Sequence, residues 1–277
     1  MDYQAELAVV RELCVEHLGE HVGSQLAVLA KPGFMVDAVG EGESAAGRSR
    51  FGGPALLEPG TAWPECEGVP LSLFAVLDME ALGPWLGEEP HGGVGLLNLF
   101  FLYPEAGDAW EVFGRVDLDD PRLCGVLAAA PARAVEVPAP AGAAVFDSVP
   151  MYAEPMVTLP DPWDDVISRL DPGPDHAGTL YEDVPNMLIQ DRFGSVWQEH
   201  SAIEGTLLAG QAFGWPNMLS NGPSPAKGER AESRHLLQLS SNELWNWSEG
   251  GWLHFMIPVT ALRDGDLSGA WTYFDGV

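Results

Sequence analysis

One ordered set of features occurs twice along the chain and limits the folds open to it. The first copy runs from FGGP at 51–54 through a loop, the apolar stretch PLSLFAVLDMEAL, a glycine pair and VGLLNLFFLY. The second runs from FGWP at 213–216 through a loop, RHLLQLSSNEL, a glycine pair and WLHFMIPV. A solenoid needs more repeats than two. The order therefore predicts two pseudo-duplicated halves, at about 46–150 and 205–277, that pack together.

The FGGP and FGWP sequences predict rigid corners that each precede a buried strand. Glycine adopts backbone angles closed to other residues, and proline fixes its own φ and restricts the residue before it. A Trp-Pro pair at 63–64 predicts another corner, with an indole large enough to fill part of a core. Aligned by letters, the two copies place Trp215 opposite Gly53. The residues given this structural role are Phe51, Gly52, Gly53, Pro54, Trp63, Pro64, Phe213, Gly214, Pro216, Gly250 and Gly251.

Hydrophobic periodicity predicts further elements along the chain. Apolar residues at helical spacing predict a helix over 2–19, followed by a short strand over 24–30 that Lys31-Pro32-Gly33 would end. A second helix is expected at 163–170, a weaker one at 184–198, and a short helical turn around Leu82 and Trp85. Strands are predicted at 71–77, 94–103, 111–116 and 134–137.

These elements predict an α+β fold, mostly antiparallel β with an N-terminal helix. We divide the chain into an N-terminal helix and strand extension at 1–45 and a main domain at 46–277. Within the main domain, an irregular middle segment at about 150–205 joins the two halves. A chain of 277 residues is long enough to bury a substantial core in this arrangement.

The chain is strongly acidic. It has 41 Asp and Glu residues against 13 Lys and Arg, which gives a net charge of −28. A surface this negative repels phosphate backbones, so we expect neither nucleic-acid nor membrane binding. Solubility alone is one explanation of the charge. Attraction of a basic protein partner is the other.

The three cysteines, at 14, 66 and 124, are widely spaced and odd in number, so they predict neither a disulfide framework nor a zinc ribbon. The N-terminal residues are acidic and amphipathic, without the basic start and apolar centre of a signal peptide. No apolar run is long enough to span a bilayer. We therefore expect a cytoplasmic protein.

The corners and strands also resemble a known family. SRFGGP at 49–54, the Trp-Pro pair at 63–64, the strand that ends at Leu77-Asp78 and GLLNLFF at 95–101 are similar to motifs of the YwqG-like family of bacterial domains of unknown function. In the second half, LLQLSS at 236–241 continues the similarity. Val76 replaces a usual glutamine, and WSE at 247–249 replaces a usual WGD. The resemblance covers roughly 45–277 and implies a mostly antiparallel, duplicated fold, but no activity.

Two sequences approach catalytic motifs without their structural context. GESAAGRS at 42–49 nearly matches a P-loop, but Arg48 replaces the lysine and FGGP follows where a helix must start. HLGEH at 17–21 matches the pattern of inverted zinc peptidases, yet Gly19 lies where a strong helix is needed. No GxSxG sequence occurs. We therefore predict no catalytic residues, no metal and no cofactor, and regard enzymatic activity as uncertain and less expected than binding.

Tryptophans of the second half are the best binding candidates. Clustered aromatic side chains near loops are typical of interfaces, although strands also need them in their cores. We expect Trp252 and Trp271 to be core residues. The predicted binding residues are Trp215, Trp245, Trp247 and Glu249.

The leading functional hypothesis is a non-enzymatic interaction protein, in its most specific form an immunity-type neutraliser of a basic partner. Charge would supply attraction and fast encounter. The alternative is a small-molecule-binding module or a hydrolase with a site in a cleft between the two halves. A small-molecule ligand therefore stays open.

Overall fold

The computed structural model describes residues 3–87, 95–117, 120–160, 164, 166–171, 173, 210–218, 233–242, 244–247 and 250–275. The helices are α1 (Tyr3–Val28), α2 (Met79–Leu86), α3 (Ala109–Phe113) and α5 (Val259–Asp264), with short 3₁₀ helices η1 (Pro121–Leu123), η2 (Ile167–Arg169) and η3 (Leu267–Gly269). The predicted helix at 184–198 and the glycine pair at 92–93 lie outside the described residues.

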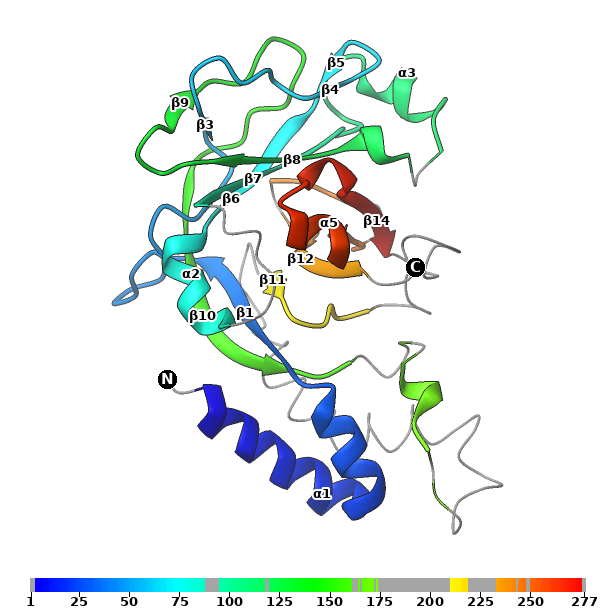
Figure 1. Cartoon of the computed structure of the whole chain (residues 1–277). Helices are drawn as coiled ribbons and strands as arrows, with labels where there is room; N and C mark the ends of the chain where they lie inside the picture. Colours follow the sequence, from blue (N-terminus) through cyan, green and yellow to red (C-terminus); the bar gives the residue numbers. More distant parts are fainter. Residues whose placement is uncertain are drawn as a thin grey trace.

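Most strands belong to one antiparallel sheet of ten strands, in the order β14-β13-β12-β11-β1-β10-β2-β6-β7-β8 (Figure 1). The strands of this sheet are β1 (Lys31–Ala38), β2 (Arg50–Phe51), β6 (Ser72–Asp78), β7 (Leu96–Phe101), β8 (Cys124–Ala129), β10 (Val149–Thr158), β11 (Gly210–Phe213), β12 (Ser233–Ser240), β13 (Trp252–Pro258) and β14 (Trp271–Asp275). Two small ribbons pair β3 (Ala55–Leu57) with β9 (Val135–Val137), and β4 (Glu65–Cys66) with β5 (Val69–Pro70). A mostly antiparallel β fold is thus confirmed.

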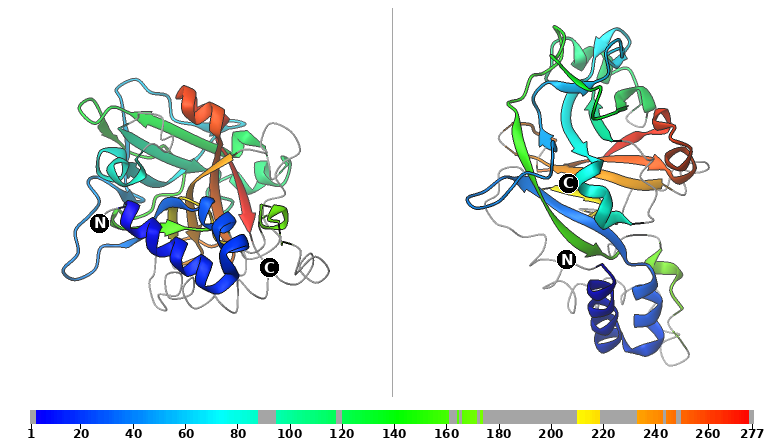
Figure 2. Two further views of the ribbon diagram at one scale, coloured as in Figure 1. Left: turned by 60° about the horizontal axis from the view of Figure 1, so that its bottom comes forward. Right: turned by 60° about the vertical axis from the view of Figure 1, so that its left-hand side comes forward.

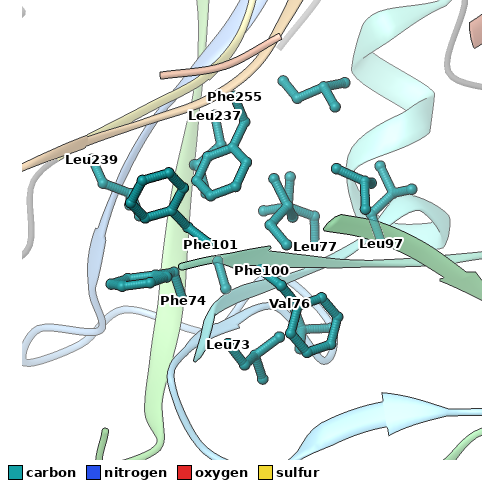
Figure 3. Close-up of a cluster of buried hydrophobic side chains, with 14 of the residues drawn as sticks. Leu73, Phe74, Val76, Leu77, Leu97, Phe100, Phe101, Leu237, Leu239 and Phe255 are labelled. Carbon is teal, nitrogen blue, oxygen red and sulfur yellow. The ribbon is translucent and has the colours of Figure 1, made fainter. Parts of the chain in front are cut away.

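The sheet curls until its two edge strands, β8 and β14, lie beside each other without a ladder between them. The curled sheet encloses a shared apolar core. Figure 3 shows this core, with Leu237, Leu239 and Phe255 of β12 and β13 gathered beside Phe74 and Phe101 of β6 and β7. All five side chains are buried. One core therefore joins strands from both ends of the sequence.

Helix α1 lies outside the curled sheet, at the end where β1 and β10 meet it (Figures 1 and 2). Its inner side packs a second, smaller core that contains Cys14, Leu26 and Leu159. The predicted strand at 24–30 is wrong, because the helix resumes after a non-helical Gly19 and continues to Val28. The following lysine, proline and glycine begin β1 instead of ending a strand.

Other predicted elements have mixed outcomes. The strands at 71–77, 94–103 and 134–137 are confirmed by β6, β7 and β9, and the helical turn by α2, whose N-terminus Asp78 caps by accepting from the backbone N–H of Glu80. The strand at 111–116 is wrong, because Ala109 and Val112 are the buried residues and their spacing suits the short helix α3. Of the helix at 163–170, the described residues form only η2.

A first group of strands (β10, β2, β6, β7 and β8) and a second group (β1, β11, β12, β13 and β14) have matching local features. The ladders β6–β7 and β12–β13 each contain one irregularity, between Leu73 and Ala75 and between His235 and Leu237. Two successive left-handed residues follow β2 at 52–53, and two lie at 213–214 at the end of β11. By backbone conformation, Gly52 thus corresponds to Phe213. The alignment of the sequences FGGP and FGWP instead pairs Gly52 with Gly214, one residue further along. The strand β1 pairs with β11 as β10 pairs with β2.

Gly214 allows the second corner to pass close to β10. Its φ is +68°, and an added Cβ would lie 2.3 Å from Oγ1 of Thr158. That hydroxyl donates to the carbonyl of Lys31 and accepts from the N–H of Trp215, so it has little freedom to move. Gly60 has a φ of +87° and nothing within 4 Å of an added Cβ.

We expect Gly214→Ala to lower the free energy of unfolding by about 3 kcal/mol, because backbone strain and the clash with Thr158 add together. Gly60→Ala should cost only about 1 kcal/mol, from strain alone. Urea denaturation of the two variants measures both values. Equal losses would contradict a close packing role for the glycine of this corner.

Candidate functional site

A row of mostly polar side chains, buried except for the half-buried Tyr273, crosses the second group of strands on the side opposite the shared core. His254 of β13 lies opposite Gln238 of β12 and Tyr273 of β14, and Gln238 lies opposite Gln211 of β11. Met256 follows His254 by two residues, and His235 lies opposite Met256. Residues two apart in a strand, and residues directly opposite in a ladder, share one face of a sheet. We call this set the histidine face: Gln211, His235, Gln238, His254, Met256 and Tyr273.

Two glutamines of the histidine face bind the backbone that leaves the second corner. The side-chain amide of Gln211 donates to the carbonyl oxygens of Phe213 and Trp215. Oε1 of Gln238 accepts from the N–H of Asn217 at 3.0 Å. The segment 215–217 is thereby fixed across β11 and β12.

The two histidines are buried, with exposed fractions of 2% for His235 and 0% for His254. Nδ1 of His235 lies 3.1 Å from the carbonyl oxygen of Phe213. Its Nε2 and both ring nitrogens of His254 have no hydrogen-bond partner in the part of the chain that the structure describes. The His254 ring stacks on Tyr273, with centroids 4.3 Å apart and planes 7° apart.

Burial keeps both imidazoles neutral. It lowers the pKa of His235 to about 4, and the backbone of Phe213 and Leu237 opposes this shift while the charge of Lys31 adds to it. Burial, and secondly the proximity of His235, lowers the pKa of His254 well below its ordinary value. Each ring therefore offers one lone pair near neutral pH.

The first group of strands has a satisfied polar side chain at the corresponding place. Asn98 of β7 accepts from the N–H of Leu56 at 2.7 Å, and it donates to the carbonyls of Leu56 and Leu127. The strand β3 thus covers this face of β7 and uses the whole amide. His254 differs because no backbone group of the described residues forms a hydrogen bond with its ring nitrogens.

Trp215 lies at the second corner, and its indole ring packs against the ammonium group of Lys31. Its ring centroid is 3.3 Å from Nζ of Lys31, and its indole N–H donates to the carbonyl of Leu29 at 2.6 Å.

A small cavity of about 20 Å³ lies next to Lys31. It is lined by Lys31, Pro32, Leu86, Phe213, Gly214, Arg234, His235 and Leu262.

Trp245 and Trp247 lie in the shared core, with exposed fractions of 1% and 3%. Both contact Phe74, with ring centroids 5.3 Å and 5.0 Å apart, so they join the two groups of strands. A binding role for these residues stays a prediction, and their geometry gives them no open surface. Glu249 lies outside the described residues. Of the predicted core tryptophans, Trp271 is buried and Trp252 is half-buried.

The sequence reasoning missed an exposed tryptophan. Trp110 of α3 is 69% exposed. Four exposed acidic side chains flank it in sequence, and we call these five residues the α3 face: Glu105, Asp108, Trp110, Glu111 and Asp117. The available signal was a tryptophan between acidic residues, directly before the segment predicted as a strand at 111–116.

The part of the chain that the structure describes contains no group of three or more His, Cys, Asp or Glu placed to hold a metal ion. None of its helices combines the length and the apolar character that crossing a membrane requires.

Residues 49–275 match the model of the family described as Domain of unknown function (DUF1963). The chain belongs to this family. No curated protein matches the chain. The DUF1963 match begins just before β2, so α1 and β1 precede it, although β1 is a central strand of the sheet. Both the histidine face and the α3 face lie within the DUF1963 segment.

Proposed function

We propose that the chain is a non-enzymatic binding protein that docks an arginine-rich basic protein on its α3 face. The exposed Trp110 among acidic residues is the observation that carries this proposal. Tryptophan and arginine are the residues that contribute most often to binding hot spots. A guanidinium that stacks on an exposed indole gains a cation–π interaction, which nearby carboxylates reinforce.

Charge supports this choice of partner. The chain has 28 more acidic than basic residues. Several described arginines already have acidic neighbours within the chain, such as Arg115 near Glu67 and Arg133 on Glu58. The excess acidity therefore attracts a cationic partner over long range and accelerates encounter, and salt weakens that attraction.

We also propose that the two groups of strands are diverged copies in a YwqG-like arrangement of bacterial origin. The matching irregularities and corners support it. In this reading, the β7–β8 connection carries α3, whereas the β13–β14 connection carries α5 and η3. The exposed tryptophan belongs to only one copy, which makes the α3 face a specialised surface.

A cytoplasmic location agrees with the three cysteines, which are all free thiols. An immunity-type neutraliser, which inactivates a basic protein by covering it, is the most specific form of the proposal. The acidic side chains of the α3 face would cover the cationic surface of the partner.

An octa-arginine peptide is the probe for this surface. We expect Trp110→Ala to weaken its binding at least about 10-fold, because the indole supplies the desolvated contact. Octa-lysine should bind the unmodified protein more weakly than octa-arginine, since an ammonium stacks less well on an indole. Isothermal titration calorimetry at low salt measures all these affinities.

The matched control removes the same number of acidic charges from another part of the surface. Asp108→Asn/Glu111→Gln removes two charges beside Trp110, and Glu136→Gln/Asp147→Asn removes two exposed charges elsewhere. Asp108 makes no side-chain cap of α3, so its replacement leaves the helix intact. We expect the first variant to weaken binding several-fold more than the second. Equal losses, together with an unchanged affinity in Trp110→Ala, would show attraction by net charge alone and refute the α3 face.

A further inference from the structure

Three buried ring nitrogens on the histidine face have no hydrogen bond among the described residues. They are Nε2 of His235 and both nitrogens of His254. A buried polar atom without a partner costs about 1–3 kcal/mol. Native structures contain few such atoms, and a bound ion or water is one established explanation of them. A neutral imidazole has one lone pair, so the two neighbouring rings can each offer one nitrogen to a common ligand.

The orientation of His235 resembles that of a metal-binding imidazole. A carbonyl oxygen only accepts hydrogen bonds, so the 3.1 Å contact with Phe213 places the proton on Nδ1. The lone pair is then on the buried Nε2. Metal-binding histidines usually donate their other N–H to a carbonyl or carboxylate in this way, which fixes the tautomer.

The second ring and a thioether complete a possible set of donors. The ring centroids of His235 and His254 are 5.9 Å apart. An ion bound at about 2 Å from one nitrogen of each ring allows a centroid separation of roughly 6 Å. Met256 lies opposite His235 and two residues from His254, so its buried side chain shares their face.

We propose that His235, His254 and Met256 form a binding site for Cu(I). Thioether and imidazole ligands without charge suit this soft monovalent ion, whereas carboxylates and water suit harder ions. Lys31 lines the same small cavity as His235, and the repulsion of its ammonium group is smaller for a monovalent than for a divalent cation. The site is independent of the α3 face and of a basic partner.

A small cavity lies against one ligand of the proposed site. His235 lines this cavity, whose volume of about 20 Å³ is enough for one water molecule. An ion that has lost its water needs less space.

The test is an anaerobic titration of the full chain with Cu(I), in the presence of ascorbate and the competing chelator bicinchoninate. We expect one tightly bound equivalent in addition to any copper that the cysteine thiols hold. His254→Asn, which installs the residue found at 98 in the first group of strands, should weaken binding at least about 100-fold. Met256→Leu conserves volume and should preserve the fold. It should remove one sulfur neighbour from the copper X-ray absorption spectrum and weaken binding roughly 10-fold.

His21→Asn is the matched control, because His21 is an exposed histidine of α1 paired with Asp171. It should leave the tight equivalent unchanged. The three cysteines are present in every variant, so copper bound by thiols persists in all of them. The same number of bound copper equivalents in His235→Asn/His254→Asn as in the unmodified chain, a spectrum unaltered by Met256→Leu, or no stoichiometric binding to the unmodified chain would overturn the proposal.

Discussion

Trp245→Ala is expected to lower the free energy of unfolding by about 4 kcal/mol, the largest loss that we predict for a single substitution. The indole is 1% exposed and contacts Phe51, Phe74 and Phe146, with ring centroids 5.3–6.3 Å apart. Its N–H donates to the carbonyl of Ser240, which loses that partner in the variant. A cavity would open where the two groups of strands meet.

Trp110→Ala is the control for this loss, because that indole is 69% exposed. It should change stability by no more than about 0.5 kcal/mol. Guanidinium denaturation followed by circular dichroism measures both variants. A small loss in Trp245→Ala would mean that this indole is not packed in the shared core, and would favour the predicted binding role for Trp245.

The second large effect concerns the amide that fixes β3 on the sheet. Asn98→Ala should cost about 3 kcal/mol, since it leaves the N–H and carbonyl of Leu56 buried without this partner. The carbonyl of Leu127 also loses a donor. Urea denaturation measures the loss, and faster amide exchange at Leu56 should accompany it.

Gln25 provides the comparison for Asn98, because its amide also clamps a backbone. It donates to the carbonyl of Asp171 and accepts from its N–H, both at 2.9 Å, in a solvent-exposed setting. Water can replace these bonds, so Gln25→Ala should cost less than about 1 kcal/mol. Similar losses for Asn98→Ala and Gln25→Ala would contradict the importance of burial at Asn98.

The sequence predicted the elements whose pattern is local. The apolar runs of β6 and β7 are buried on both faces, and continuous apolar character indicates this directly. The segment at 24–30 has a similar apolar character, yet Leu26 and Ala27 pack with Cys14 across a kink in one helix. Tertiary contact, which no local pattern records, decided between helix and strand.

The candidate sites could not be predicted from local sequence patterns, because they depend on strand register, backbone conformation and exposure in the folded chain. The histidine face needs the register of four strands, because His235 and His254 are 19 residues apart and become neighbours only through a ladder irregularity. The letters FGGP and FGWP aligned Gly53 with Trp215, whereas backbone angles pair Gly53 with Gly214. Exposure of Trp110 follows from the turn of α3, which a strand assignment hides.

Hydrogen exchange of the backbone amides, with and without octa-arginine, tests the central claim most directly. The claim is that a basic partner binds the α3 face and leaves the core tryptophans untouched. We predict slower exchange on binding at 105–117, with unchanged exchange around Trp245 and at 210–218. Protection confined to 210–218, or bound peptide without any protection at 105–117, would contradict it.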